Sequence, residues 1–223
     1  MNYIKKGLLL IFIFSLLIGG DRIAVATKVI GSVEYVRGKD FAKSVKKGHI
    51  IESGDKITTA KGGFVALLFI DDKSALKVKE NSEVIISGNK NNQAIAKRIG
   101  LKGGTIRAQV GKKQNRDFIV QTTVSVASVK GTDFWVVSDN NNGDSVIGIE
   151  GVIQLTNKIS GDKIDIPSGI TGLATKDGQL QSFNTDPKTI PKDPSGDNIG
   201  NQKLKIEFKD ANGKKKTLVI EYK

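Results

Sequence analysis

The feature that most constrains this chain is a series of short, strand-length runs of β-branched and apolar residues, spaced about ten residues apart. Clusters of glycine, asparagine, aspartate and lysine separate the runs. This pattern is typical of an all-β sandwich, roll or barrel rather than of packed helices. The runs cover residues 29–36, 50–58, 63–70, 75–79, 83–87, 104–110, 117–122, 125–129, 134–138, 146–155 and 163–166.

We therefore expect an all-β fold, arranged as a sandwich, a roll or a solenoid-like stack of short strands. Only residues 93–99 show a weak helical pattern, which would make one or two turns at most. The content of 25 glycines against 4 prolines agrees with a fold that contains many tight turns.

The composition changes after Phe183. Residues 184–201 contain three of the prolines among polar residues, which predicts a linker or a surface loop. In residues 202–223, apolar and charged residues alternate on both sides of Asn212 and Gly213, a pair that favours a tight hairpin turn. We expect a C-terminal β-hairpin. Because an isolated hairpin is marginally stable, its apolar face should be buried on the domain or on a partner. That face consists of Leu204, Ile206, Phe208, Leu218, Ile220 and Tyr222.

The N-terminus resembles an export signal. Lys5 and Lys6 precede an uncharged stretch at residues 7–20, and the small residues Ala24 and Ala26 follow. This order predicts a secretory signal peptide that is cleaved after Ala26. The apolar stretch is shorter than the ~20 residues of a comfortable membrane span, although an uncleaved signal anchor is the alternative. In either case we expect the rest of the chain in the periplasm or outside the cell.

These features divide the 223 residues into four expected segments. They are a signal peptide (1–26), an all-β domain (27–183), a proline-containing linker or surface loop (184–201) and a C-terminal hairpin (202–223).

The chain is basic. Its formal net charge of +12 becomes +10 if residues 1–26 are removed, because three basic residues and one acidic residue leave with them. This charge suits anionic partners such as lipid headgroups or wall polymers. The lysines fit equally well as solvated residues that discourage strand aggregation. No aromatic residues alternate with the lysine runs to make a stacking platform, so we do not expect a nucleic-acid partner. The oligomeric state is left open.

The composition argues against catalysis. The chain has no cysteine and one histidine, which excludes thiolate chemistry and most zinc chemistry. We interpret His49 as a turn-edge residue and Asp71-Asp72 as part of a hairpin turn. Residues 139–144 resemble a calcium loop only weakly, because Gly143 takes the place of the third ligand. We therefore expect no catalytic residue, no metal site and no cofactor.

Seven short motifs occur in a fixed order between residues 30 and 183, and together they resemble the FecR domain family. Two positions depart from the family pattern, since Lys73 stands where a turn glycine is usual and Thr123 where proline is frequent. The motifs are Gly31-Ser32-Val33, Gly54-Asp55-Lys56-Ile57-Thr58-Thr59, Phe64 to Phe69 with Asp71-Asp72, Leu101 to Ile106, Phe118 to Thr122, Val129-Lys130-Gly131-Thr132-Asp133-Phe134, and Ile149-Glu150-Gly151-Val152-Ile153.

Five of the motif residues are expected to serve the scaffold rather than a ligand. Gly131 should supply a backbone conformation or a close approach that a Cβ would forbid, and the Thr132 hydroxyl can stabilise a turn. Phe134 and Trp135 lie on opposite faces of one strand, and at least one of them should be in the core. Gly151, next to Glu150, predicts a bulge or a tight bend.

The resemblance implies an extracytoplasmic all-β module that interacts with a protein. The best-known family members are membrane regulators of iron uptake, with a cytoplasmic anti-sigma segment and one transmembrane helix ahead of a periplasmic domain. Only six residues precede the apolar stretch here, too few to grip a sigma factor. The sigma-regulating role is therefore not expected of this sequence.

Three functional readings follow. The first is an exported, non-enzymatic binding or signalling module of the cell envelope that engages a protein partner, with the hairpin contributing by β-strand addition. The alternative is a cationic cell-wall or membrane-surface adhesion protein that binds an anionic polymer. A polysaccharide-cleaving enzyme would need two acids across a cleft, and the sequence nominates no such pair.

Overall fold

The computed structural model describes residues 21–91, 94–111, 118–139, 141–195, 202–209 and 213–222. Within these ranges it contains nineteen β-strands and one short 3-10 helix, η1 (Pro187–Thr189), and no α-helix. The expected all-β fold and the expected C-terminal hairpin are confirmed. No helix in the described part of the chain is long and apolar enough to cross a membrane.

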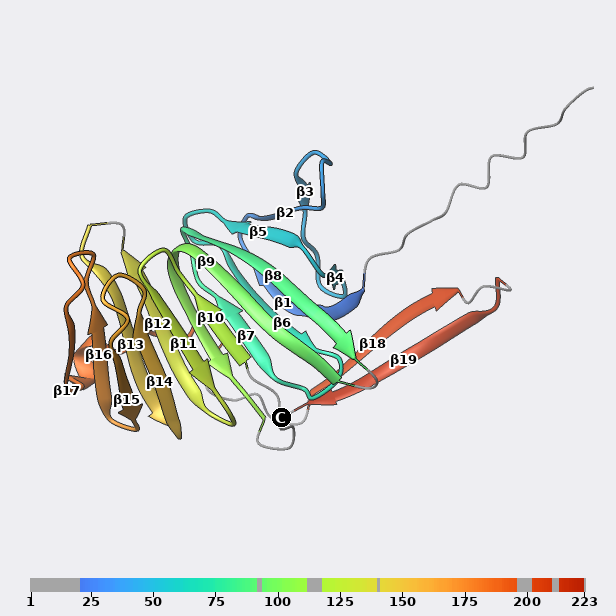
Figure 1. The fold of residues 1–223 in the computed structure, drawn as a ribbon. Helices are drawn as coiled ribbons and strands as arrows, with labels where there is room; N and C mark the ends of the chain where they lie inside the picture. Colours follow the sequence, from blue (N-terminus) through green and yellow to red (C-terminus); the bar gives the residue numbers. More distant parts are fainter. Residues whose placement is uncertain are drawn as a thin grey trace, which may run out of the picture.

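The strands form two stacked layers that share one long strand, β9 (Figure 1). The layer that we call sheet A uses the second half of β9, and the layer that we call sheet B uses its first half. All neighbouring strands are antiparallel except β9 and β10, which are parallel. In spatial order, sheet A comprises β4 (Ile50–Glu52), β1 (Arg22–Ile30), β6 (Phe64–Phe69), β7 (Ala75–Val78), β9 (Ala94–Gln109), β12 (Asp133–Asp139), β13 (Gly143–Glu150), β16 (Ile170–Ala174) and β17 (Leu180–Asn184).

Sheet B covers the inner face of sheet A, and the hydrophobic core lies between them. Phe69 of sheet A and Phe118 of sheet B meet edge to face, with ring centroids 5.8 Å apart. Alternation along each strand sends every second side chain into this core. In spatial order, sheet B comprises β3 (Lys43–Ser44), β2 (Val33–Val36), β5 (Asp55–Thr59), β8 (Ser82–Asn91), β9, β10 (Phe118–Gln121), β11 (Ser125–Val129), β14 (Val152–Asn157) and β15 (Lys163–Pro167).

The helical candidate at residues 93–99 is wrong. From Ala94 the chain is part of β9, and its side chains alternate, with Ala96 and Arg98 exposed while Lys97 and Ile99 are buried. Pairing with β8 on one side and β10 on the other satisfies the backbone here, so tertiary context decides against the helix.

Three expected strands are each split at a glycine. The run at 29–36 becomes β1 and β2, separated at Gly31, the run at 50–58 becomes β4 and β5, separated at Gly54, and the run at 146–155 becomes β13 and β14, separated at Gly151. At all three positions the chain passes from sheet A to sheet B. The strands β16 and β17 were not among the expected runs.

The expected domain boundary at residue 27 falls inside a strand. β1 begins at Arg22, and Ile23, Ala24, Val25 and Ala26 are fully buried. The first half of β1 pairs with β4 on one side and β6 on the other. The β-domain of the structure therefore starts at least five residues earlier than the sequence suggested. The remaining part of the expected signal peptide lies outside the described residues.

The C-terminal hairpin consists of β18 (Gln202–Lys209) and β19 (Lys215–Tyr222). Its register places Ile206 opposite Leu218 and Leu204 opposite Ile220, as the alternation predicted. The expectation that its apolar face is buried is wrong for Phe208 and Leu218, which are 43% and 44% exposed. The hairpin as a whole projects away from the sheets (Figure 1). The side chains of Leu204, Ile220 and Tyr222 are outside the described set.

Candidate interaction surface

The motif residues come together at one corner of the sandwich. Gly131 has a positive φ of 70° and precedes β12, while Gly151, with φ 81°, joins β13 to β14. A Cβ on Gly151 would lie 2.8 Å from Thr132 Cγ2 and 3.0 Å from the Gly131 carbonyl oxygen. Phe134 is fully buried in the core, and Glu150, which is exposed, stands opposite Asp133 in the register. Gly151 is thus held in a close approach and Phe134 in the core, and the absence of a ligand role for the motif residues stays a prediction.

An open depression adjoins this corner, lined by Lys73, Gln109, Val110, Gly111 and the motif residues Gly131, Thr132 and Glu150, together with Asp133. The Thr132 hydroxyl is buried and has no hydrogen-bond partner in the described part of the chain. The depression holds no arrangement of a nucleophile with a base. Across the described residues, no group of three or more His, Cys, Asp or Glu is placed to hold a metal ion.

His49 packs against Tyr35, with ring centroids 4.2 Å apart. Burial, followed by the charge of Arg37, lowers the pKa of His49 below its ordinary value. Arg37 is itself committed to Asp55, because its Nε and Nη2 donate to the two carboxylate oxygens at 2.8 and 2.7 Å. This explains the aspartate of the Gly54-Asp55 motif as a structural anchor, a role that the sequence alone did not assign.

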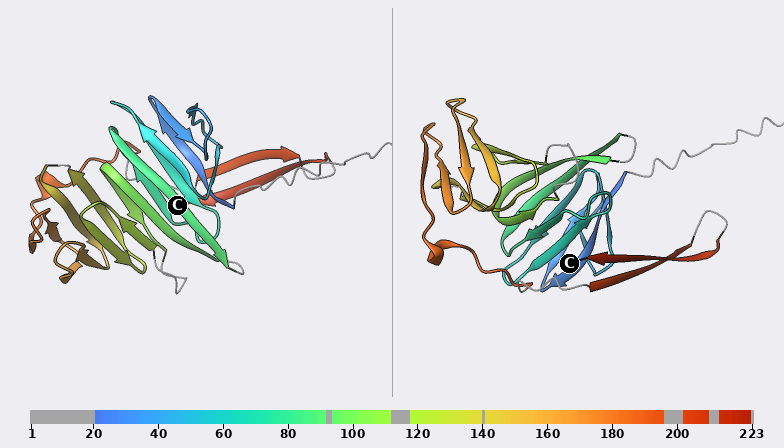
Figure 2. Two further views of the ribbon diagram at one scale, coloured as in Figure 1. Left: turned by 45° about the horizontal axis from the view of Figure 1, so that its top comes forward. Right: turned by 90° about the horizontal axis from the view of Figure 1, so that it is seen from below.

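The segment at residues 185–195, which we call the strap, crosses the outer face of sheet A (Figure 2). At one end, the hydroxyls of Thr185 and Thr171 are 2.8 Å apart, and at the other, Lys28 Nζ donates to the Ser195 carbonyl at 3.3 Å. Between these ends lies one continuous row of cross-strand partners, one from each of seven neighbouring strands. The row is Lys28, Ala66, Lys77, Arg107, Trp135, Ile147 and Thr171.

The length of the strap matches the row that it follows. Six steps of about 4.8 Å between neighbouring strands make roughly 29 Å. Eleven extended residues reach up to about 36 Å, and the single turn of η1 takes up the slack. The strap gives the outer face of sheet A a cover, and the interior of the row is buried, with Lys77 1%, Trp135 2% and Ile147 3% exposed.

Asp193 fixes the strap to the sheet. Its Oδ2 accepts hydrogen bonds from Lys77 Nζ at 2.5 Å and from Arg107 Nη1 at 3.1 Å. Burial alone would raise the pKa of Asp193, but hydrogen bonds from Lys77 and Ser195 and the charge of Lys77 outweigh it and lower the pKa below its ordinary value. The Arg107 guanidinium also lies over the Trp135 ring, 5.5 Å from its centroid, and makes a cation–π contact there.

The strap leads the chain to the hairpin, which contacts the sheet at the end formed by β1 and β6. Ile206 packs against a small outer cluster centred on Val25 and Leu68. Beyond this contact the hairpin extends away from the sandwich (Figures 1 and 2). Phe208, Leu218 and Val219 remain 43–47% exposed along it. The molecule therefore carries a projecting arm with apolar side chains, held at its root.

Residues 55–154 match the family model described as FecR protein. The expected resemblance is thereby confirmed for this region, which runs from β5 to β14 and includes all five motif residues. A comparison with curated proteins finds no match.

Two crystal structures of a candidate anti-sigma factor from Parabacteroides distasonis ATCC 8503 are similar in fold. The structure at 2.50 Å resolution has 14% sequence identity and a TM-score of 0.50, over 59% of this chain and 60% of that chain. The structure at 1.65 Å resolution has 13% identity and a TM-score of 0.48 over the same shares. The matched part of this chain thus spans three fifths of that protein's length, and at this identity the likeness concerns the fold alone.

Proposed function

We propose that this protein is an exported, non-enzymatic, FecR-like signalling or binding module of the cell envelope, and that it engages a protein partner through its C-terminal hairpin. The observation that carries the proposal is the projecting hairpin, which contacts sheet A through Ile206 and leaves Phe208, Leu218 and Val219 exposed. The FecR domain at residues 55–154 supports a regulatory rather than a catalytic role.

The hairpin has the features that strand addition requires. In the described residues β18 and β19 pair only with each other, so each strand keeps one outer edge of backbone donors and acceptors. A partner strand that adds to such an edge gains main-chain hydrogen bonds, and the exposed apolar side chains supply selectivity. A two-stranded hairpin is only marginally stable by itself, and a third strand supplied by a partner would stabilise it.

Export is part of the proposal, with one adjustment to the maturation site. Removal of residues 1–26 would delete four fully buried residues and the whole pairing of β1 with β4. We therefore propose that the mature chain keeps Asp21 onward, either because cleavage occurs ahead of it or because the apolar stretch at residues 7–20 stays attached as an anchor.

The test is recovery of a partner by the tagged full-length chain from envelope extracts, at low and at high salt. A Phe208→Ser/Leu218→Ser double variant should lose a salt-resistant protein band. The matched control is Phe183→Ser, which removes an exposed aromatic residue, 51% exposed, from β17. If the double variant and the control recover the same band in equal amounts, the hairpin is not the binding arm.

An anionic wall polymer is the second candidate partner, favoured by the net charge of +12. Binding of this kind rests on screened surface charge and should disappear at high salt. In the same experiment, recovery of polymer at low salt only, with no protein band at either salt, would favour this adhesion role over the protein-binding role.

A further inference from the structure

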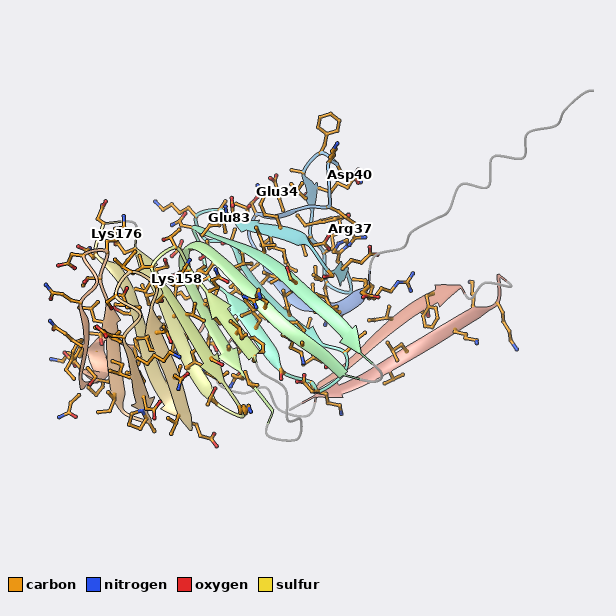
Figure 3. All side chains as sticks on the ribbon, viewed as in Figure 1. Glu34, Arg37, Asp40, Glu83, Lys158 and Lys176 are labelled. Atoms are coloured by element: carbon orange, nitrogen blue, oxygen red, sulfur yellow. The ribbon has the colours of Figure 1, made fainter. Side chains whose placement is uncertain are left out.

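Besides the hairpin, a second segment projects from the molecule, at the β2–β3 edge of sheet B. The loop at residues 37–42, which we call the tip loop, joins β2 to β3 and stands clear of sheet B (Figures 1 and 3). Phe41 in this loop is 91% exposed, whereas the other exposed large hydrophobic residues range from 38% to 62%. An aromatic side chain presented so completely to solvent indicates a surface that receives it.

The base of the tip loop is braced, so Phe41 is held outward. Arg37 bonds to both Asp55 oxygens and forms an ion pair with Glu52 at 2.9 Å. Within the loop, the Asp40 amide donates to the Arg37 carbonyl at 3.0 Å, and Lys43 Nζ donates to Asp40 at 2.9 Å. Figure 3 shows Arg37 at the base and Asp40 near the end of the projection. These hydrogen bonds and ion pairs hold the tip loop in one conformation.

The tip loop and the residues that follow β3 carry exposed lysines, Lys39 in the loop and Lys46 and Lys47 at its base. Arg37 and Lys43 are matched by acidic partners, but Lys39, Lys46 and Lys47 are exposed and have no ion-pair partner among the described residues. An aromatic side chain flanked by lysines is the combination that anchors proteins at the boundary between lipid headgroups and acyl chains. The lysines meet anionic headgroups while the ring enters the boundary region.

We propose that the tip loop docks on an anionic lipid bilayer, with Phe41 entering the headgroup boundary and Lys39, Lys46 and Lys47 against the phosphates. The size of the loop favours a bilayer over a protein. Stable protein interfaces bury about 800 Å² on each partner, and a six-residue tip with one large apolar side chain offers far less. A bilayer needs no complementary shape. The start of β1 lies at the same end of the sandwich (Figure 1), and the apolar stretch at residues 7–20 precedes it in the sequence.

The chain has no cysteine, so a single environment-sensitive label can report on the tip. We would place it at Ala42→Cys, which is exposed and keeps Phe41, and compare it with Ser182→Cys on the exposed strand β17. The probes are vesicles of phosphatidylcholine alone and vesicles that also contain phosphatidylglycerol. The label at position 42 should shift to the blue only with the mixed vesicles, and the label at position 182 should not shift with either.

Variants in the labelled background separate the two parts of the site. Lys39→Gln/Lys46→Gln/Lys47→Gln should raise the lipid concentration for the half-maximal shift by about fivefold per lysine removed. Phe41→Ser should raise it by about tenfold, while Lys163→Gln on β15, which is exposed and distant in sequence, should leave it unchanged.

A label at position 42 that keeps its emission in water when the protein is bound to mixed vesicles would overturn the proposal. An equal response to pure phosphatidylcholine, or a response only when envelope protein is added, would also overturn it. The hairpin plays no part in this measurement, so its result is independent of the partner experiment above.

Discussion

Lys77 and Asp193 lie 116 positions apart in the sequence and form a 2.5 Å ion pair that is almost closed to solvent, with side chains 2% and 5% exposed. The pair joins β7 to the strap, the segment that precedes the hairpin in the sequence. A buried charge is tolerated when it is paired and hydrogen-bonded, and here Arg107 and Ser195 complete the set around the carboxylate.

Loss of the Asp193 charge should release the strap. Asp193→Asn leaves Lys77 buried without its counter-charge, and we expect a loss of about 3 kcal/mol in the free energy of unfolding. Urea titration measures it, with Asp165→Asn on the exposed side of β15 as a control that should stay within about 0.5 kcal/mol of the wild type. An Asp193→Asn variant as stable as the control would show that the strap is not held by this pair.

The same carboxylate should make stability depend on pH in acid. The pKa of Asp193 is lowered from its ordinary value of 3.8, so the folded state favours the ionised form. Its contribution is therefore complete above about pH 4, the unfolded value, and is lost as the pH falls through the lower folded value. Urea titrations from pH 6 into acid should show a steeper fall for the wild type than for Asp193→Asn. Parallel curves would contradict this assignment.

Substitution of two glycines with the same φ angle can distinguish the cost of backbone strain from the cost of steric overlap. Gly151 and Gly161 both have φ 81°, but a Cβ at Gly161 would meet nothing within 4 Å, whereas one at Gly151 would meet Thr132 and the Gly131 carbonyl. Gly161→Ala should lower the free energy of unfolding by about 1 kcal/mol, because alanine is strained at a positive φ. Gly151→Ala should cost more, by about 1–3 kcal/mol, because neighbours must shift. Equal losses in urea titration would show that the motif corner tolerates the added atom.

Intact-mass measurement of the protein locates its mature N-terminus. We expect the intact mass of the protein isolated from the envelope to include residues 21–26. In purified form, a chain that starts at Thr27 should be less stable than one that starts at Asp21 by at least about 4 kcal/mol, because burial of Ile23 and Val25 is lost. If the native protein begins at Thr27 and is as stable as the longer form, cleavage after Ala26 is correct and residues 21–26 are not part of the folded domain.

The sequence predicted most of the strands because their alternation and their turn residues both carry the signal, and it predicted the hairpin from Asn212-Gly213 for the same reason. The sequence did not show that β1 begins ahead of residue 27, because one residue type can serve two purposes; cleavage itself stays a prediction. Ala24 and Ala26 satisfy the small-residue pattern of a cleavage site, but small residues also fit a strand that is covered on both faces. Residues 93–99 were too short for the period to distinguish a helix from a strand.

The strap and its anchor were beyond prediction for a different reason. Residues 184–201 have no periodicity, and nothing in their composition indicates which surface they cover. Lys77 lies within a run of strand residues, and a lysine between apolar residues is a signal for a buried ion pair that could have been noticed. Its partner Asp193 could not be found from one sequence, because only the register of seven strands brings the two residues together.

The central claim, that the hairpin is the arm that binds a protein partner, is tested most directly by site-specific photo-crosslinking in intact cells. A photoreactive side chain at Leu218, an exposed residue of β19, should give a discrete adduct with one envelope protein. The same group at Phe183, on the exposed strand β17, should give none. Absence of a protein adduct at position 218, or the same adduct at both positions, would contradict the account.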